Sequence, residues 1–274
     1  MENFVYFGYD KFDAFMNMAI DDTIRNLSEK TQQSFVRFYD FERPSLILAY
    51  VEHPSDVIAG HADGYDITRR LSNGSVILCD ERTLAYSIVA PRNRYDLTTM
   101  HETFGARIGR SIKELIRQDE VAIGEHFSVR VNNRTIAGHG QRAGPSVLYH
   151  GVLAVRPWDM KKIAASIRLR QGEYQFIQSL PGISDYVENP DKGALAAQLL
   201  DGITNKSHAP ISDELRRSIM ADAAQKADFY KSEDWIEFGP YHDRPDTRHL
   251  LEKRAGLGFC FADFITPENV KTKI

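Results

Sequence analysis

Two arginines beside a loop of small residues are the strongest candidate for a binding site in this sequence. Arg69 and Arg70 precede Ser72, Asn73, Gly74 and Ser75. Guanidinium groups bind carboxylate or phosphate through paired donors, and a small-residue loop lets backbone N–H groups approach the same anion. We therefore expect the arginines and the loop to bind substrate. The same pattern also fits a hairpin turn flanked by solvated arginines.

A second polar segment, residues 135–142, places glycines within a strand-like pattern. Glycine inside a strand often marks the close approach of a ligand or of another backbone, so Gly138 is a candidate binding residue. His139, Gln141 and Arg142 are polar groups that would lie nearby. A β-bulge without a ligand explains the glycines equally well.

Two residues with reactive side chains lie in or beside apolar strands. His150 follows Leu148 and Tyr149, and a lone histidine in such a run is more often a core residue than a catalyst. Cys79 also follows an apolar run, where a small buried hydrophobe is the simpler interpretation. A nucleophilic cysteine would need a nearby base and a lowered pKa.

The spacing of apolar residues predicts the elements that must position these groups. Spacings of three and four predict helices over 13–28, 101–118, 158–168 and 211–229. Alternation and short apolar runs predict strands over 34–41, 45–51, 76–78, 84–90, 127–131, 134–137 and 146–155. Asn132-Asn133 would turn one hairpin, and turn signals predict an irregular chain from Gln171 to Pro210.

This order of elements predicts an α+β fold with a mixed, largely antiparallel sheet and flanking helices. We expect a domain over residues 1–200 and, over 201–274, a helical C-terminal tail or small accessory domain.

The composition excludes several classes of protein. The chain has 274 residues, a net charge of −4 and a hydrophobic fraction of 42%, which is typical of a globular protein and not of a nucleic-acid binder. No run approaches ~18 apolar residues, so we expect no membrane span. The start lacks the layout of a signal peptide, and two cysteines make neither a disulfide framework nor a zinc cluster. We expect a cytoplasmic location and no metal site within the protein.

In their order along the chain, these segments resemble the lipoate–protein ligase family, within the wider group of biotin and lipoate ligases and octanoyltransferases. Five segments over roughly residues 1–160 carry the resemblance. They are Asn17–Asp22, similar to the family's Asn-Met-Ala-Leu-Asp-Glu helix; Arg37–Leu46; Arg69–Asp80, similar to Arg-Arg-x-(Ser/Thr)-Gly-Gly-Gly-Ala-Val-x-His-Asp; Ile136–Arg142; and His150-Gly151.

The resemblance implies a biotin/lipoate ligase-like fold and an acyl-transferring activity. Family ligases use ATP and Mg²⁺ to convert lipoate or octanoate into an acyl-adenylate. They then transfer the acyl group to a lysine of an acceptor domain, such as the lipoyl domain of a 2-oxoacid dehydrogenase or the glycine cleavage carrier protein. The loop and its arginines would hold the acyl-adenylate, Thr135 and Gly138 would line the reacting carbonyl, and His150 would support the pocket.

The sequence departs from the family pattern at two positions that bear on catalysis. Thr135 stands where the family has a lysine, and Cys79 stands where the loop segment has a histidine. Between Lys30 and Lys161 the chain contains only one lysine, Lys113.

Three alternatives to an ATP-dependent ligase therefore stay open. One is an inactive member of the same fold that binds an acyl ligand or an active partner subunit. Another is an octanoyltransferase that uses Cys79, and the third is an α+β interaction module unrelated to the family. A cavity beside the loop would favour acyl binding, whereas filling by Val76 or Leu78 would favour an inactive site.

Overall fold

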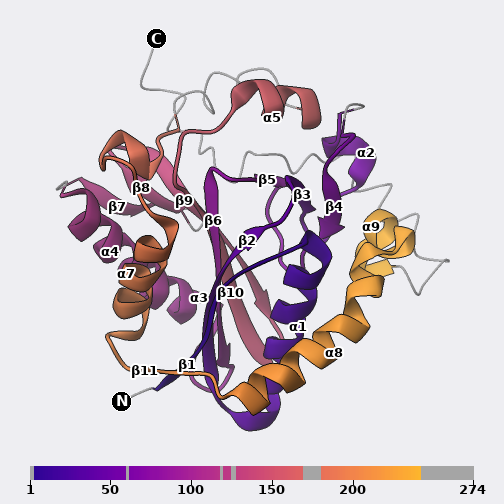
Figure 1. Ribbon diagram of the computed structural model, residues 1–274, viewed down its shortest axis with the longest axis horizontal. Helices are drawn as coiled ribbons and strands as arrows, with labels where there is room; N and C mark the ends of the chain where they lie inside the picture. The colour runs from indigo at the N-terminus through magenta and orange to yellow at the C-terminus, as the bar shows by residue number, and fades with distance from the viewer. Residues whose placement is uncertain (1–2, 60–61, 118–119, 125–127, 169–179, 242–274) are drawn as a thin grey trace.

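The computed structural model describes residues 3–59, 62–117, 120–124, 128–168 and 180–241 (Figure 1). Within these residues, eight strands form one large sheet and three form a small one. In spatial order the large sheet contains β11 (His208–Pro210), β1 (Phe4–Phe12), β2 (Ser34–Phe41), β6 (Thr83–Pro91), β10 (Ser146–Ala154), β9 (Arg134–Ala143), β8 (Ser128–Val131) and β7 (Val121–Gly124). The small sheet contains β4 (Asp66–Arg69), β3 (Ser45–Leu48) and β5 (Ile77–Cys79).

The large sheet is mixed, with antiparallel pairing over most of its width. β1 pairs in parallel with β11 and β2, whereas the pairs from β2 across to β7 are antiparallel. In the small sheet β3 pairs in parallel with β4 and antiparallel with β5. The predicted α+β fold with a mixed, largely antiparallel sheet is confirmed.

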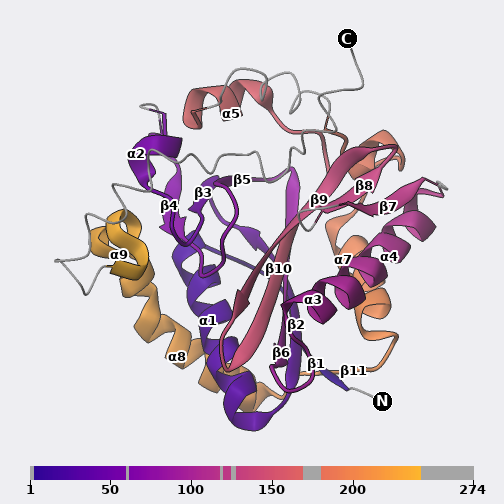
Figure 2. The same cartoon turned by 180° about the vertical axis from the view of Figure 1, so that it is seen from behind.

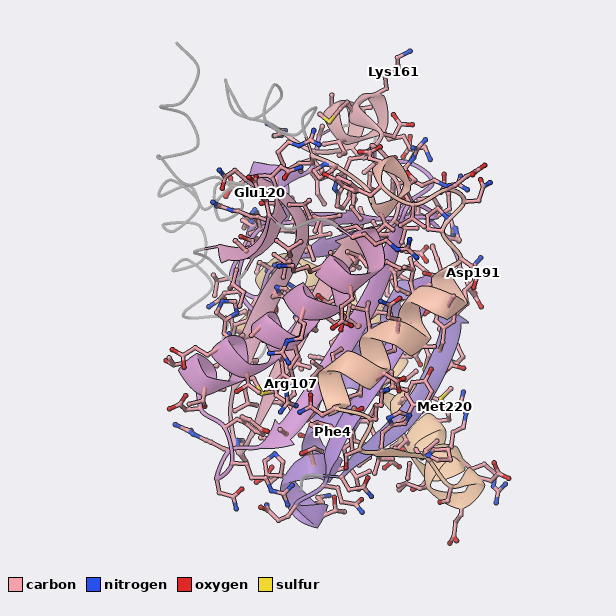
Figure 3. The ribbon with its side chains drawn as sticks, turned by 90° about the vertical axis from the view of Figure 1, so that its left-hand side faces the viewer. Phe4, Arg107, Glu120, Lys161, Asp191 and Met220 are labelled. Atoms are coloured by element: carbon pink, nitrogen blue, oxygen red, sulfur yellow. The ribbon has the colours of Figure 1, made fainter. Side chains whose placement is uncertain are left out.

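Helices cover both faces of the large sheet. One face packs against α4 (Ala106–Ile116) and α7 (Lys192–Thr204), which lie side by side in Figure 3. The other face packs against α1 (Ala14–Thr31), and α8 (Asp213–Lys231) lies against the outer side of α1 (Figure 1). The shorter helices are α2 (Pro54–Val57), α3 (Leu97–Met100), η1 (His101–Gly105), α5 (Met160–Ser166), η2 (Ile183–Asp185), α9 (Glu233–Phe238) and η3 (Gly239–Tyr241).

The predicted helix over 13–28 is α1, and its sequence explains both its start and its buried face. The side chain of Asp13 caps the first turn by accepting a hydrogen bond from Met16 N at 2.7 Å. Met18, Ile20 and Ile24 are buried against the sheet and α8. Because α1 is held between two layers, polar residues on its inner face must find partners inside the protein.

Two local predictions about turns and loops had different outcomes. Asn132 and Asn133 turn the β8–β9 hairpin at φ values of 49° and 60°, so that prediction is confirmed. The prediction of an irregular chain from Gln171 to Pro210 is wrong where α7 forms. The turn signal at Asn189-Pro190 precedes the N-cap of α7, Asp191, and the helix then buries Leu195 and Leu199 against α4.

The C-terminal described segment packs tightly against the rest of the protein. Residue 200 falls inside α7, β11 pairs with β1, and Trp235 of α9 is buried against α8. The remainder of the predicted tail, residues 242–274, lies outside the described residues. No helix in the described part of the chain is long and apolar enough to span a membrane.

Candidate functional site

An apolar cavity lies between the large sheet, α1 and the small sheet. Figure 2 shows the small sheet above α1 and beside the long strands β9 and β10. The cavity has a volume of about 30 Å³, which is room for about two water molecules. Its apolar walls come from α1, β2, β3, β5, β6 and β10 and include Met18, Tyr39, Phe41, Ile47, Ile77, Ala85 and Val152. A longer ligand therefore enters only if these side chains move apart.

Polar groups gather at one end of the same cavity. Arg70, which follows β4, and His150 of β10 line it together with Gly138 and Gly140 of β9. The Arg70 guanidinium donates to the carbonyl oxygens of Ile47, Asn73 and Ser75 at 2.9–3.0 Å. Arg70 therefore holds the 72–75 loop closed against the small sheet.

Three polar side chains lie in a row behind this polar end. Ser72 Oγ is hydrogen-bonded to His150 Nε2, and Arg70 Nε donates to the same hydroxyl at 3.2 Å. On the other side of the imidazole, His150 Nδ1 lies 3.6 Å from Asp21 Oδ2. All three of Ser72, His150 and Asp21 are buried. The 72–75 loop, strand β10 and helix α1 thus each contribute one of these three side chains.

Asp21 is held in its charged form by its surroundings. Arg37 Nη1 donates to Asp21 Oδ1 at 3.1 Å, and the Ser87 hydroxyl donates to the same oxygen at 2.8 Å. Burial alone would raise the pKa of Asp21, but the ion pair with Arg37 and the hydrogen bonds from His150 and Ser87 hold it below its ordinary value. Burial lowers the pKa of His150, which favours a neutral imidazole.

The sequence model of the lipoyl protein ligase A/B catalytic domain matches residues 13–220, which include every element of this site. The chain belongs to this family.

Solved structures of lipoate ligases share the fold of this lipoyl ligase family member. The bipartite lipoate protein ligase from Thermoplasma acidophilum has a TM-score of 0.73 at 19% identity, over 86% of this chain and 96% of that one. A lipoate-protein ligase A bound with ATP has a TM-score of 0.71 at 18% identity, over 86% and 99%. LipL1 from P. falciparum in complex with lipoate has a TM-score of 0.71 at 12% identity, over 85% and 74%. Among curated proteins no match is found.

The structure separates the roles of the two arginines that the sequence placed together. The guanidinium of Arg69 is buried and donates to the carbonyl oxygens of Ala49 and Glu52 at 2.8 and 2.6 Å. It also donates to the carbonyl oxygens of Trp235, at 3.0 Å, and Ile236. Its donors therefore bind the protein's own backbone, and Arg70 is the arginine that borders the cavity.

The loop residues 72–75 do not line the cavity themselves, but they contact Arg70, which does. Gly74 adopts a φ of 115°, which other residues rarely do, and so allows the loop to turn between Asn73 and Ser75. Val76 and Leu78 pack into the small core beneath α5, so they leave the cavity unfilled. Gly138 lines the cavity from β9.

Cys79 lines the cavity, but its surroundings do not activate it. Burial raises the pKa of its thiol well above the ordinary value, with a further contribution from Asp80. Within the part of the chain that the structure describes, no base forms a hydrogen bond with its sulfur. Because the thiolate is the reactive form, Cys79 is a poor nucleophile in this arrangement.

Thr135 borders a second, smaller cavity that shares a wall with the first. This cavity is about 20 Å³, and Ile77, Gly138 and Val152 line both. Thr135 is buried, and its Oγ1 atom has no hydrogen-bond partner among the residues that the structure describes. An unpaired buried hydroxyl is costly, so a ligand that reached this point would gain a hydrogen bond from Thr135.

Several members of the site were not proposed as functional from the sequence. Asp21 and Arg37 occur in the family-like segments, but no local pattern shows that their side chains meet. Glu52 was also missed. Its two carboxylate oxygens accept hydrogen bonds from Ala49 N and Val76 N at 2.8 and 2.9 Å, so it ties the loop to the small sheet.

Replacing Glu52 by glutamine should remove a pH dependence of stability. Burial raises the pKa of Glu52 from 4.5 to about 7, against the opposing effect of Arg70. The folded state therefore favours the protonated carboxyl, and its contribution to stability is lost as the pH rises from about 4.5 to about 7. Relative to Glu52→Gln, the wild-type free energy of unfolding should fall by about 3 kcal/mol over this interval. Urea unfolding at pH 4.5 and pH 8 measures both proteins, and parallel profiles would contradict the expectation.

Proposed function

We propose that this protein transfers a lipoyl or octanoyl group to a lysine of a lipoyl acceptor domain. The observation that carries the proposal is the apolar cavity that ends at Arg70 and His150. An apolar pocket with a few convergent polar groups suits the chemistry of an acyl chain whose carbonyl lies at the polar end, and the apolar walls would have to move apart to admit the chain. Membership of the lipoyl ligase family supports an acyl group as the substrate, and two of the solved relatives named above were obtained with ATP or with lipoate bound.

The acceptor would be the lipoyl domain of a 2-oxoacid dehydrogenase or the glycine cleavage carrier protein. One relative is described together with its E2 lipoyl domain, and that ligase is bipartite. A partner subunit that completes the site is therefore part of the proposal.

The described residues fit ATP and Mg²⁺ poorly. Acyl-adenylate formation needs positive charge beside the reacting carbonyl and the phosphates. The family's lysine position holds the uncharged Thr135, and carbonyl oxygens engage the guanidinium groups of Arg69 and Arg70. We therefore assign no step to ATP, and the experiment below compares two sources of the acyl group.

A transfer assay with two acyl donors tests the proposal. The purified chain is mixed with a lipoyl domain and either octanoate, ATP and Mg²⁺ or an octanoyl thioester of acyl carrier protein. We expect the mass of the lipoyl domain to increase by one octanoyl group with the thioester donor. A lipoyl domain whose target lysine is replaced by arginine is the control. Absence of acylation with both donors, with and without the partner subunit, would contradict the proposal.

Thr135 also supports a second candidate, an inactive protein that binds an acyl ligand. Calorimetry with a non-hydrolysable octanoyl-adenylate analogue, together with the transfer assay, decides between the two. Tight binding without transfer from either donor favours the inactive protein, whereas any transfer that depends on the cavity residues eliminates it.

Restoring the lysine should reveal the ATP route. We expect Thr135→Lys to gain octanoate- and ATP-dependent transfer at least tenfold above the wild-type level, because an ammonium group would then face the reacting carbonyl. Thr135→Met, of similar length but uncharged, is the matched control. Equal ATP-dependent rates in the two variants would show that the missing charge is not what limits this route.

A further inference from the structure

Ser72 has the surroundings of a catalytic nucleophile. A serine becomes nucleophilic when a neighbouring base takes its proton and a third group orients that base. Ser72 Oγ contacts His150 Nε2, and His150 Nδ1 lies 3.6 Å from Asp21 Oδ2. With its proton on Nδ1, facing Asp21, the neutral imidazole presents a lone pair to the serine. This tautomer follows from the partners of the two ring nitrogens.

The hydroxyl of Ser72 lies directly behind the polar wall of the cavity. Its contacts include Arg70 and His150, and both of these line the cavity. The third neighbour is Gly140, where a Cβ atom would lie only 2.4 Å from Ser72 Oγ. Gly140 lines the cavity, and its lack of a side chain is what allows the Ser72 hydroxyl to pack against it, so an acyl carbonyl in the cavity would reach the serine after a shift of the 72–75 loop.

Charges around the three residues suit the transfer of a proton. Asp21 is fixed by Arg37 and Ser87, so it can stabilise an imidazolium that forms between it and the reacting carbonyl. Arg70 Nε, at 3.2 Å from Ser72 Oγ, places positive charge next to the attacking hydroxyl, which favours its loss of a proton. Ser87 donates to Asp21, and among the described residues no base forms a hydrogen bond with Cys79, whereas Ser72 is hydrogen-bonded to the imidazole that lies beside Asp21.

We propose that Ser72 takes the acyl group from a thioester donor, with His150 as its general base and Asp21 as the positioning residue. The inference rests on the proposed acyl transfer and specifies its covalent step. A thioester supplies an activated carbonyl, so this route needs neither ATP nor the family's lysine.

The reaction has two balanced steps. Ser72 Oγ forms a bond to the acyl carbon while the C–S bond breaks, and the serine proton passes through His150 Nε2 to the leaving thiolate. An acyl-serine ester results. The ε-amine of the acceptor lysine then attacks the ester, forming the amide while the C–O bond to Ser72 breaks. The proton of the amine passes through His150 and returns to Ser72 Oγ.

Trapping of the acyl-enzyme tests the inference. The full chain is incubated with octanoyl-CoA, quenched in acid and analysed by intact mass and by peptide mapping. We expect one octanoyl adduct on Ser72 that resists neutral hydroxylamine, as an ester does. Ser72→Ala should lose the adduct, whereas Ser72→Cys should keep it as a hydroxylamine-sensitive thioester. Ser166→Ala, another buried serine but outside the site, should retain the wild-type adduct.

Asp21→Asn provides a readout that a purely structural role would not produce. Asp21 raises the pKa of His150 against the effect of burial. Without its charge the imidazolium is less stable, so the acid limb of the acylation pH profile should move to lower pH. The rate of adduct formation should fall by about 10²–10⁴-fold. An unshifted profile would overturn the role of Asp21.

The outcomes separate this inference from the proposed function. An adduct on Cys79, or a Ser72→Ala variant that still acylates the lipoyl domain from the thioester, overturns the inference and leaves the proposed function intact. An adduct on Ser72 without transfer to the lipoyl domain supports the inference and counts against the proposed acceptor. Absence of both adduct and transfer overturns both.

Discussion

Replacing Arg37 by methionine should lower the free energy of unfolding by about 3–5 kcal/mol, because it leaves a buried carboxylate without its charged partner. Arg37 is fully buried and donates to Asp21 at 3.1 Å and to the side chain of Asn17 at 2.6 Å. Its guanidinium also lies 4.1 Å from the centre of the Tyr39 ring. Methionine keeps much of the apolar volume, so the loss reports chiefly on the charge and its hydrogen bonds.

The matched control is Arg43→Met. Arg43 also forms an ion pair, 3.2 Å from Asp66, but its side chain is 60% exposed. Exposed pairs contribute little, so we expect a loss of about 1 kcal/mol or less. In the Arg37→Met background, Asp21→Asn should restore part of the lost stability by removing the unpaired charge. Chemical unfolding measures all of these variants. Equal losses for Arg37→Met and Arg43→Met, or a double variant less stable than Arg37→Met, would refute the electrostatic explanation.

Arg69→Met should detach α9 and lower the free energy of unfolding by about 3 kcal/mol or more. Arg69 donates to carbonyl oxygens of the 49–52 loop and of α9, and Trp235 Nε1 donates back to the Arg69 carbonyl at 3.1 Å. Each buried carbonyl left unpaired costs about 1–3 kcal/mol. Because the lost bonds all join α9 and the loop to β4, local opening should appear there first.

Hydrogen exchange and unfolding measurements together test this expectation. Backbone amides of α9 should exchange faster in Arg69→Met, while those of α4 and α7 keep their protection. Lys226→Met is the control, since Lys226 also joins the C-terminal helices to the body, through a partly exposed ion pair with Asp22 at 2.7 Å. It should cost about 1 kcal/mol or less. Wild-type protection of α9 in Arg69→Met would show that Arg69 does not anchor this helix.

Local chemistry in the sequence was sufficient to predict several elements and the family. The helices expected over 13–28 and 211–229 form as α1 and α8, with Asp13 and Ser212 as their N-caps. Asn132 and Asn133 tolerate positive φ, so the β8–β9 hairpin turns where expected. These signals are reliable because each depends on neighbours within a few residues.

α7 shows where local signals were insufficient. Its turn signal at Asn189-Pro190 is compatible with a loop or with the start of a helix. The N-cap at Asp191 and the packing of Leu195 and Leu199 against α4 together stabilise the helix. The apolar face of α7 therefore stabilises the helix through contact with α4, which lies far away in the sequence.

For the candidate site, too, some features follow from the sequence and others depend on the tertiary structure. The sequence by itself determined the family, because the order and spacing of motifs are local properties. It did not distinguish Arg69 from Arg70, which are neighbours of identical type. Only the tertiary structure directed one guanidinium to the backbone of α9 and the other to the cavity. It also brought Asp21 of α1 to His150 of β10 and Ser72 of the loop, because burial forces such polar groups to find partners within the fold.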